Sequence, residues 1–190
     1  MTLEVRRFER GELEALHREL PSWSSAQYPR RLEAQARGEM VQVFAWDGNA
    51  PVGRGMVLFA EHGEYSESAV RERCAEVRDV FVAPSHRRRG AASGIMRALE
   101  DASRRAGWAR IGLDVSLDDE AAPARALYEA LGYRHAHGPF VSSATLDTDD
   151  GPLHVHAVLN YLVKDLLTSA RRRSRKVRWL GFGTSSSARR

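Results

Sequence analysis

The sequence predicts a mixed α/β fold: a mostly antiparallel sheet of six to seven strands, with a central parallel strand pair and helices on both faces. Short β-prone segments alternate with amphipathic helical segments along the 190 residues, which is the pattern of a sheet covered by helices. The unit from Glu76 to Ser116 runs strand, helix, strand, and such crossovers are parallel and right-handed. The turn Asp47-Gly48-Asn49 instead predicts an antiparallel hairpin.

The first half of the chain supplies four predicted strands and two predicted helices. Apolar residues alternate or cluster in the strands, and leucines recur at helical spacing in the helices. Pro21 and Gly38 end the two helices. A polar loop with a short helical turn, from His62 to Ala75, precedes the fourth strand. The strands are Leu3–Phe8, Met40–Trp46, Pro51–Phe59 and Glu76–Val82, and the helices are Glu9–Leu20 and Gln27–Gly38.

The second half supplies two helices and three strands. Apolar residues at steps of three and four predict a helix from Ala91 that ends before Gly107, and Pro123 begins another that ends at Gly132. The predicted strands are Arg110–Ser116, Tyr133–Val141 and Leu153–Leu162, the last two joined by a loop rich in Asp and Thr.

Composition places the chain among ordinary globular proteins, since 43% of its residues are apolar and 28% are charged. The first ten residues have no apolar signal segment, and no run reaches the length of a membrane span. Cys74 is the single cysteine, so no internal disulfide is expected. We therefore expect a cytoplasmic protein without a membrane partner.

The basic charge is concentrated at the C-terminus. Residues 164–190 carry nine Lys or Arg side chains and one acid, so residues 1–163 are mildly acidic. This distribution disfavours nucleic acid as a partner of the folded part. We predict one domain over residues 1–168, followed by a basic, disordered tail over 169–190. The alternative for the tail is that its Arg171–Arg178 cluster binds nucleic acid or an acidic partner.

The segment from Asp79 to Gly94 indicates an anion site. A short apolar strand ends at Pro84, three arginines follow, and small residues then open a helix. Small residues let backbone N–H groups approach a ligand, and the helix N-terminus adds partial positive charge.

Two motifs in this part of the chain resemble a known family. Arg87-Arg88-Arg89-Gly90-Ala91-Ala92 is similar to the Arg/Gln-x-x-Gly-x-Gly/Ala motif of the GNAT superfamily, the acetyl-CoA-dependent N-acetyltransferases. The segment Ala124–Tyr133 resembles the family's Ala-x-x-Leu-Tyr-x-x-x-Gly-Phe/Tyr pattern. The two motifs occur in the family's order, each in its expected structural setting.

The resemblance implies that acetyl-CoA is the co-substrate and that no metal is needed. Its pyrophosphate would lie on the turn and helix start, and its pantetheine arm would lie along the preceding strand. One departure is Ala121, at a position that is often Asn in relatives, which leaves Asp118 or Asp119 as a replacement contact. The implied cofactor-binding residues are Val80, Phe81, Val82, Arg87, Arg88, Arg89, Gly90, Ala91, Ala92 and Ser93.

Two residue types are needed for direct transfer of an acetyl group to an amine: a base for the ammonium proton and an acid for the leaving thiolate. Tyr128 is the expected acid, at the position that matches the family's tyrosine. Its alternative is a structural core tyrosine. Glu76 is the favoured base over Asp79 or a water-mediated route; in a regular strand these two carboxylates would face opposite sides, although a bulge would change that count.

Other candidate groups receive structural interpretations. Cys74 is expected to be a small buried thiol. The His135/His137 and His154/His156 pairs could approach one another on neighbouring strands, but we assign no metal to them. Trp23 and Tyr28 could line a substrate cleft or cap a core.

The leading functional interpretation is an N-acetyltransferase acting on a primary amine of a small molecule or a protein. The acidic body suits a cationic acceptor, such as a polyamine, an aminoglycoside-like compound or a protein amino terminus. The alternative is a non-catalytic acyl-CoA-binding or sensor module. Dimers are common in the family, so a homodimer is compatible with the sequence without being required by it.

Overall fold

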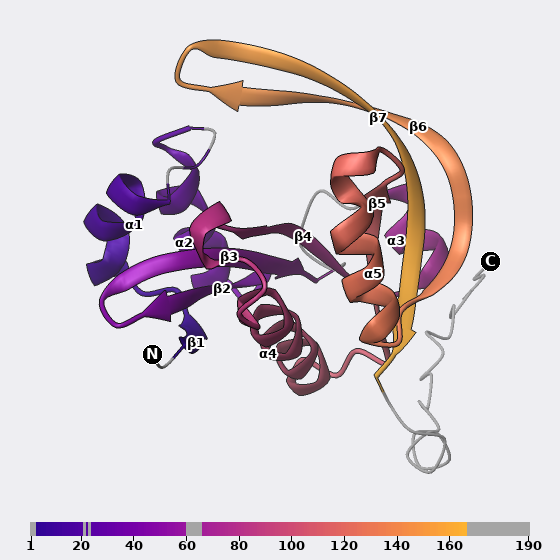
Figure 1. Cartoon of the computed structure of the whole chain (residues 1–190), viewed down its shortest axis with the longest axis horizontal. Coiled ribbons are helices and arrows are strands. Elements are labelled where there is room, and N and C mark those ends of the chain that lie inside the picture. The colour runs from indigo at the N-terminus through magenta and orange to yellow at the C-terminus, as the bar shows by residue number, and fades with distance from the viewer. Residues whose placement is uncertain (1–2, 21, 23, 60–65, 167–190) are drawn as a thin grey trace, which may run out of the picture.

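A seven-stranded mixed sheet, in the order β1-β2-β3-β4-β5-β7-β6, forms the centre of the fold (Figure 1). The structure is a computed structural model that describes residues 3–20, 22, 24–59 and 66–166. The predicted tail and Trp23 lie outside the described residues. All neighbouring strands are antiparallel except β4 and β5, which are parallel. The predicted fold class is therefore confirmed.

The elements follow the predicted order. The strands are β1 (Leu3–Arg7), β2 (Met40–Asp47), β3 (Ala50–Leu58), β4 (Ala75–Val82), β5 (Arg110–Ser116), β6 (Arg134–Thr148) and β7 (Gly151–Asp165). The helices are α1 (Leu13–Glu19), α2 (Gln27–Ala36), α3 (Glu67–Glu72), α4 (Ala91–Arg105) and α5 (Ala122–Ala130), with short 3-10 turns at Arg10–Glu12, Pro84–His86 and Asp119–Ala121. None of the helices described here is long and apolar enough to cross a membrane.

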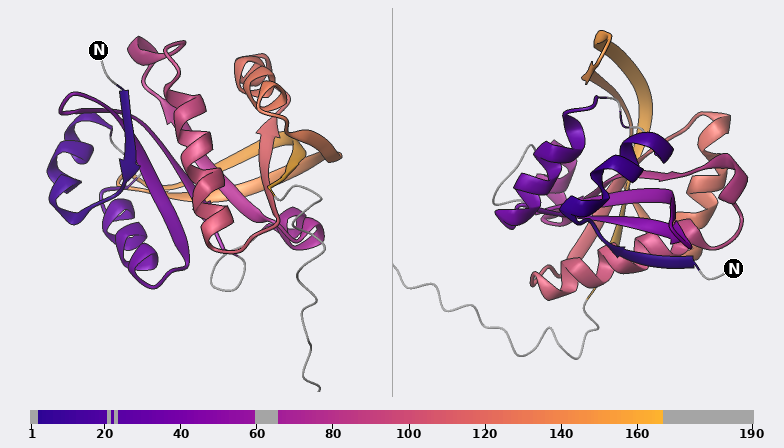
Figure 2. Two further views of the ribbon diagram at one scale, coloured as in Figure 1. Left: turned by 90° about the horizontal axis from the view of Figure 1, so that it is seen from below. Right: turned by 90° about the vertical axis from the view of Figure 1, so that its left-hand side faces the viewer.

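The β6–β7 hairpin is longer than predicted. The Asp- and Thr-rich segment 142–152, predicted to be a loop, forms most of the outer half of the hairpin. Polar side chains pair across its two strands, with Ser143 bonded to His156 at 2.8 Å and Thr145 to His154 at 2.9 Å. This outer half projects beyond the other strands and arches towards the N-terminal helices (Figures 1 and 2).

Helices cover both faces of the sheet. On one face, α4 and α5 pack on a core that includes Ile95, Leu99 and Tyr128. On the other face, α1 and α2 surround a second core of aromatic residues, in which Tyr28 is fully buried. Of the two interpretations of Tyr28, the structure supports the core residue.

The parallel strands β4 and β5 part soon after they meet. Their pairing spans only Ala75–Val77 on β4 and Ile111–Leu113 on β5 within the described residues. Beyond these positions β4 stays paired with β3, and β5 stays paired with β7. The second half of β4 therefore presents a backbone edge towards a gap in the centre of the sheet.

Candidate active site

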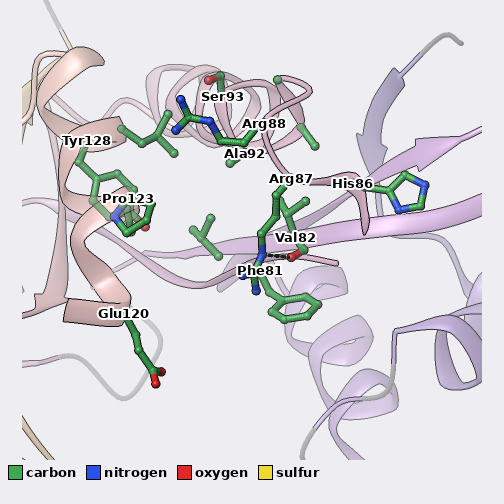
Figure 3. A pocket seen from close by; sticks show the side chains of 15 residues that line it. Phe81, Val82, His86, Arg87, Arg88, Ala92, Ser93, Glu120, Pro123 and Tyr128 are labelled. Atoms are coloured by element: carbon green, nitrogen blue, oxygen red, sulfur yellow. Dashed lines mark hydrogen bonds between the residues drawn. The ribbon is translucent and has the colours of Figure 1, made fainter. Parts of the chain in front are cut away.

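A cavity of about 650 Å³ lies where β4 parts from β5. Its walls come from the end of β4, the turn that follows, the start of α4, and α5. In Figure 3, Pro123 and Tyr128 lie across open space from Val82 and Arg87, with Arg88, Ala92 and Ser93 at one end. Nine of the ten predicted cofactor-binding residues line this cavity; Arg89 is the exception.

The turn before α4 has the geometry of an anion-binding loop. Arg88 has φ +63° and Gly90 has φ +88°, so the backbone enters the left-handed region twice within three residues. Arg87 Nε donates to Val82 O at 3.1 Å, which ties the turn back to β4. The 15-residue helix α4 then begins at Ala91, with its N-terminus towards the cavity. Such a turn and helix start offer N–H donors and positive potential to a phosphate.

Tyr128 reaches the same cavity from α5. Its side chain packs beside Tyr133, with the ring centroids 6.0 Å apart, and the residue is 7% exposed. Burial raises the pKa of its hydroxyl to about 12, so the phenol stays protonated at neutral pH. No hydrogen bond from this hydroxyl to another described residue is formed, which leaves it available as a donor.

Glu76 lies deeper and does not line the cavity. The residue is 1% exposed, and its Oε2 accepts from the Ser66 N–H at 3.2 Å and from Arg78 Nη2 at 3.1 Å. Its Oε1 is buried without a hydrogen-bond partner in the described part of the chain. A buried acceptor atom of this kind is costly unless something pairs with it.

Asp114 on β5 is a carboxylate that the sequence analysis missed. Its pKa is raised to about 6, first by burial and then by the negative charge of Glu76. Its Oδ1 is, like Glu76 Oε1, buried and without a partner among residues that the structure describes. The sequence could have indicated this carboxylate. Because side chains alternate along a strand, Asp114 lies on the face of β5 opposite to the core residues Leu113 and Val115.

The relation between Glu76 and Asp79 differs from that in a regular strand. Ala75, Val77, Val80 and Val82 all pack towards the α4 core, so one extra residue is inserted between Val77 and Val80. Two β4 residues, Asp79 and Val80, stand against one β3 residue in the register. This bulge brings Glu76 and Asp79 to the same face, away from α4.

The structure also gives the positions of Cys74, of the histidine pairs and of the acidic residues near Ala121. Cys74 is fully buried, and burial is the main cause that raises the pKa of its thiol to about 11. His137 bonds Ser68 at 3.0 Å, far along the hairpin from His154 and His156. Near Ala121, Glu120 lines the cavity, whereas neither Asp118 nor Asp119 does.

Structures of N-acetyltransferases share this fold. An N-acetyltransferase from Staphylococcus aureus Mu50 is 14% identical, with a TM-score of 0.63, and the match covers 88% of this chain and all of that one. The ribosomal-protein-S18-alanine N-acetyltransferase of Escherichia coli is 16% identical, with a TM-score of 0.57 and coverage of 88% and 96%. The yncA protein of Salmonella typhimurium, solved with its cofactor acetyl-CoA, is 15% identical, with a TM-score of 0.60 and coverage of 88% and 96%.

The sequence itself matches a family model. The model of the acetyltransferase (GNAT) family matches residues 4–133, about two thirds of the chain, and the chain therefore belongs to this family. The resemblance noted from the two motifs is thereby confirmed. No curated protein sequence gives a significant match.

Proposed function

We propose that the protein transfers an acetyl group from acetyl-CoA directly to a primary amine of a small molecule or a protein. One observation carries the proposal: the turn before α4 and the Tyr128 side chain, which come from separate parts of the chain, line a single cavity at the parting of β4 and β5. A volume of about 650 Å³ suits a cofactor-sized ligand.

The residues around the cavity fit a coenzyme A ester. Backbone N–H groups from Arg88 to Ser93 would hold the diphosphate, and the arginines of the turn add positive field. The backbone of Val80, Phe81 and Val82 would pair with the amides of the pantetheine arm, because this edge of β4 has lost β5 as its partner. The bound ester supplies the acetyl thioester, and N–H groups on the same edge would stabilise negative charge on its carbonyl oxygen.

Tyr128 acts as the acid in this proposal. Its hydroxyl is protonated at neutral pH, and its side chain lines the cavity. It would donate a proton to the sulfur as the thiolate leaves, and a positioned acid of this kind contributes about 100-fold or more to a rate.

Glu76 and Asp114 act together as the base. An ammonium group must lose a proton before nitrogen can attack. Asp114 is the more exposed of the two, and the negative charge of Glu76 raises its pKa. Asp114 would therefore take the proton, and Glu76 would tune its pKa. Both face away from α4, so the amine would approach from the sheet face opposite the α4–α5 side.

The acceptor is expected to be cationic. Glu76 Oε1 and Asp114 Oδ1 are buried and have no hydrogen-bond partner among the residues that the structure describes, which favours an ammonium group. Protein amino termini belong among the candidates, since the similar Escherichia coli enzyme is named for acetylation of an alanine of ribosomal protein S18.

An amine panel tests the function. Purified protein should consume acetyl-CoA in the presence of at least one member of a panel of polyamines, aminoglycosides and peptides with free amino termini. Binding of coenzyme A without turnover on any of them would favour the alternative, a non-catalytic acyl-CoA sensor.

Replacing Tyr128 by Phe tests the acid. Turnover should fall by about 100-fold or more, because the thiolate leaves without a proton donor, while calorimetry should give an unchanged Kd for coenzyme A. Tyr133→Phe is the matched control, since Tyr133 is a neighbouring buried tyrosine that does not line the cavity. Equal turnover in the two variants would remove Tyr128 from the mechanism.

The pH dependence tests the carboxylate pair. Because the pKa of Asp114 is about 6, kcat/KM should rise with pH through about 6 and then level off, as Asp114 loses its proton. Asp114→Asn should abolish this rise and lower the plateau of kcat/KM. As a control, Asp119→Asn, at an exposed residue, should change neither the rise nor the plateau.

The Glu76→Gln variant separates the two members of the pair. If Glu76 tunes Asp114, the midpoint of the rise should move to lower pH, because the negative charge that raises the pKa of Asp114 is gone. Complete loss of the rise in Glu76→Gln, with the rise retained in Asp114→Asn, would make Glu76 the base by itself.

A further inference from the structure

We propose that Asp79 is a positioning residue, whose carboxylate is clamped by Arg31 and Arg54 and thereby holds the β4 bulge that turns Val80–Val82 towards the cavity. The inference rests on the proposed function, because it concerns how the same cavity is shaped. It gives Asp79 a role different from that of the base considered in the sequence analysis.

The bulge depends on an unusual backbone conformation at Asp79. Its φ is +54°, one of three positive values among the described residues other than glycine. Asp and Asn adopt this region more readily than other side chains, yet it remains unfavourable relative to an extended strand. A residue persists there when its surroundings hold it, so the holding contacts need to be identified.

Two guanidinium groups supply those contacts. Asp79 Oδ2 accepts from Arg31 Nη1 at 2.6 Å and from Arg54 Nε at 3.0 Å. The three side chains are only 10%, 8% and 15% exposed for Arg31, Arg54 and Asp79, respectively. Charge-assisted hydrogen bonds in such a sheltered place are strong and directional. Because Arg31 lies on α2 and Arg54 on β3, the clamp fixes the bulge to two other elements.

The opposite face leaves the bulge no room to relax. Gly55 is the β3 residue that faces the bulge, and a Cβ built on it would lie 2.6 Å from Ile95 Cγ2 of α4. Helix α4 therefore sits directly on the backbone at this point. The bulge is confined between α4 on one side and the arginine clamp on the other.

The clamp also contacts the wall of the cavity. The Arg54 guanidinium lies 4.9 Å from the centre of the Phe81 ring, and Phe81 lines the cavity. One arginine thus holds both the bulged residue and a wall residue two positions further along β4. A shift in the clamp would move the backbone edge that is proposed to pair with the pantetheine arm.

The same contacts argue against Asp79 as the base. Its Oδ2 already accepts from two charged donors, whereas Asp114 Oδ1 has no partner among residues described in the structure. In this proposal Asp79 positions the backbone of the β4 bulge, whereas Asp114 accepts the proton of the amine.

Two substitutions at Asp79 separate the roles. Asn tolerates positive φ and can accept a hydrogen bond from an arginine, but Ala can do neither well. For a positioning role, Asp79→Asn should keep kcat/KM within about 10-fold and Asp79→Ala should lower it by about 100-fold, as misplacement of reacting groups does. The rise of kcat/KM near pH 6 should persist in both.

An equal, near-complete loss in Asn and Ala, with the rise near pH 6 abolished, would make Asp79 the base and overturn the proposal. Full activity in Asp79→Ala would also overturn it. Arg31→Met provides a second route to the same result if Asp79→Ala fails to fold, since it removes one arm of the clamp from α2. Like Asp79→Ala, this variant should have a lower kcat/KM, with the midpoint of the pH-dependent rise unchanged. A kcat/KM equal to that of the wild type would count against the clamp.

The Kd for coenzyme A distinguishes failure of the clamp from failure of the proposed function. The constant should rise several-fold in Asp79→Ala and Arg31→Met and less in Asp79→Asn, whether or not any amine is acetylated. If the wild-type protein binds coenzyme A without turnover, the proposed enzymatic function is rejected. The Kd values of the variants for coenzyme A would still test the clamp. An unchanged Kd in all three variants would reject the clamp.

Discussion

The parting of β4 from β5 is the constraint on which the rest of the site depends. The two strands share three paired positions, and each then stays with its outer neighbour, β3 or β7. Backbone groups of β4 that a continuous sheet would satisfy are left facing the gap. A ligand with its own amides can satisfy them, and a strand edge inside a sheet is otherwise unfavourable.

The two halves of the molecule also meet at the tip of the β6–β7 hairpin. The tip of the β6–β7 hairpin reaches the start of α2, where the Ser25 N–H donates to the Asp149 carboxylate at 3.0 Å. Hydrogen bonds from Ser25 and Ser24, which lie just before α2, lower the pKa of Asp149. The strand pair at the base of the gap and this contact at the hairpin tip together join the β1–β4 half to the β5–β7 half.

The two faces of the sheet divide the chemistry between them. The α4–α5 side supplies the turn with its left-handed residues, the helix N-terminus and the Tyr128 hydroxyl. The other side supplies the carboxylates Glu76 and Asp114. In the proposed mechanism, the phosphate site and the ammonium site therefore lie on opposite faces of the sheet.

Local patterns in the sequence predicted the parts of the site that are local in the structure. The turn from Arg87 to Ala92 and the α5 segment with Tyr128 are each contiguous in the sequence, so local motifs could predict them. The bulge was not predicted, because the contact proposed to hold it joins Asp79 to Arg31, 48 residues away. Residues 142–152 of the hairpin were predicted to be a loop, because polar side chains such as Thr145, which bonds His154 across the strands, take the place of an apolar alternation there.

Hydrogen–deuterium exchange with and without coenzyme A tests the central claim most directly, because it reports on backbone amides. If the cavity holds the cofactor through backbone, saturating coenzyme A should slow exchange in peptides that cover Val80–Val82 and Arg88–Ser93. The outer hairpin, residues 141–158, should exchange at an unchanged rate. Protection confined to other parts of the chain, or no protection at a concentration where binding is saturated, would contradict the account.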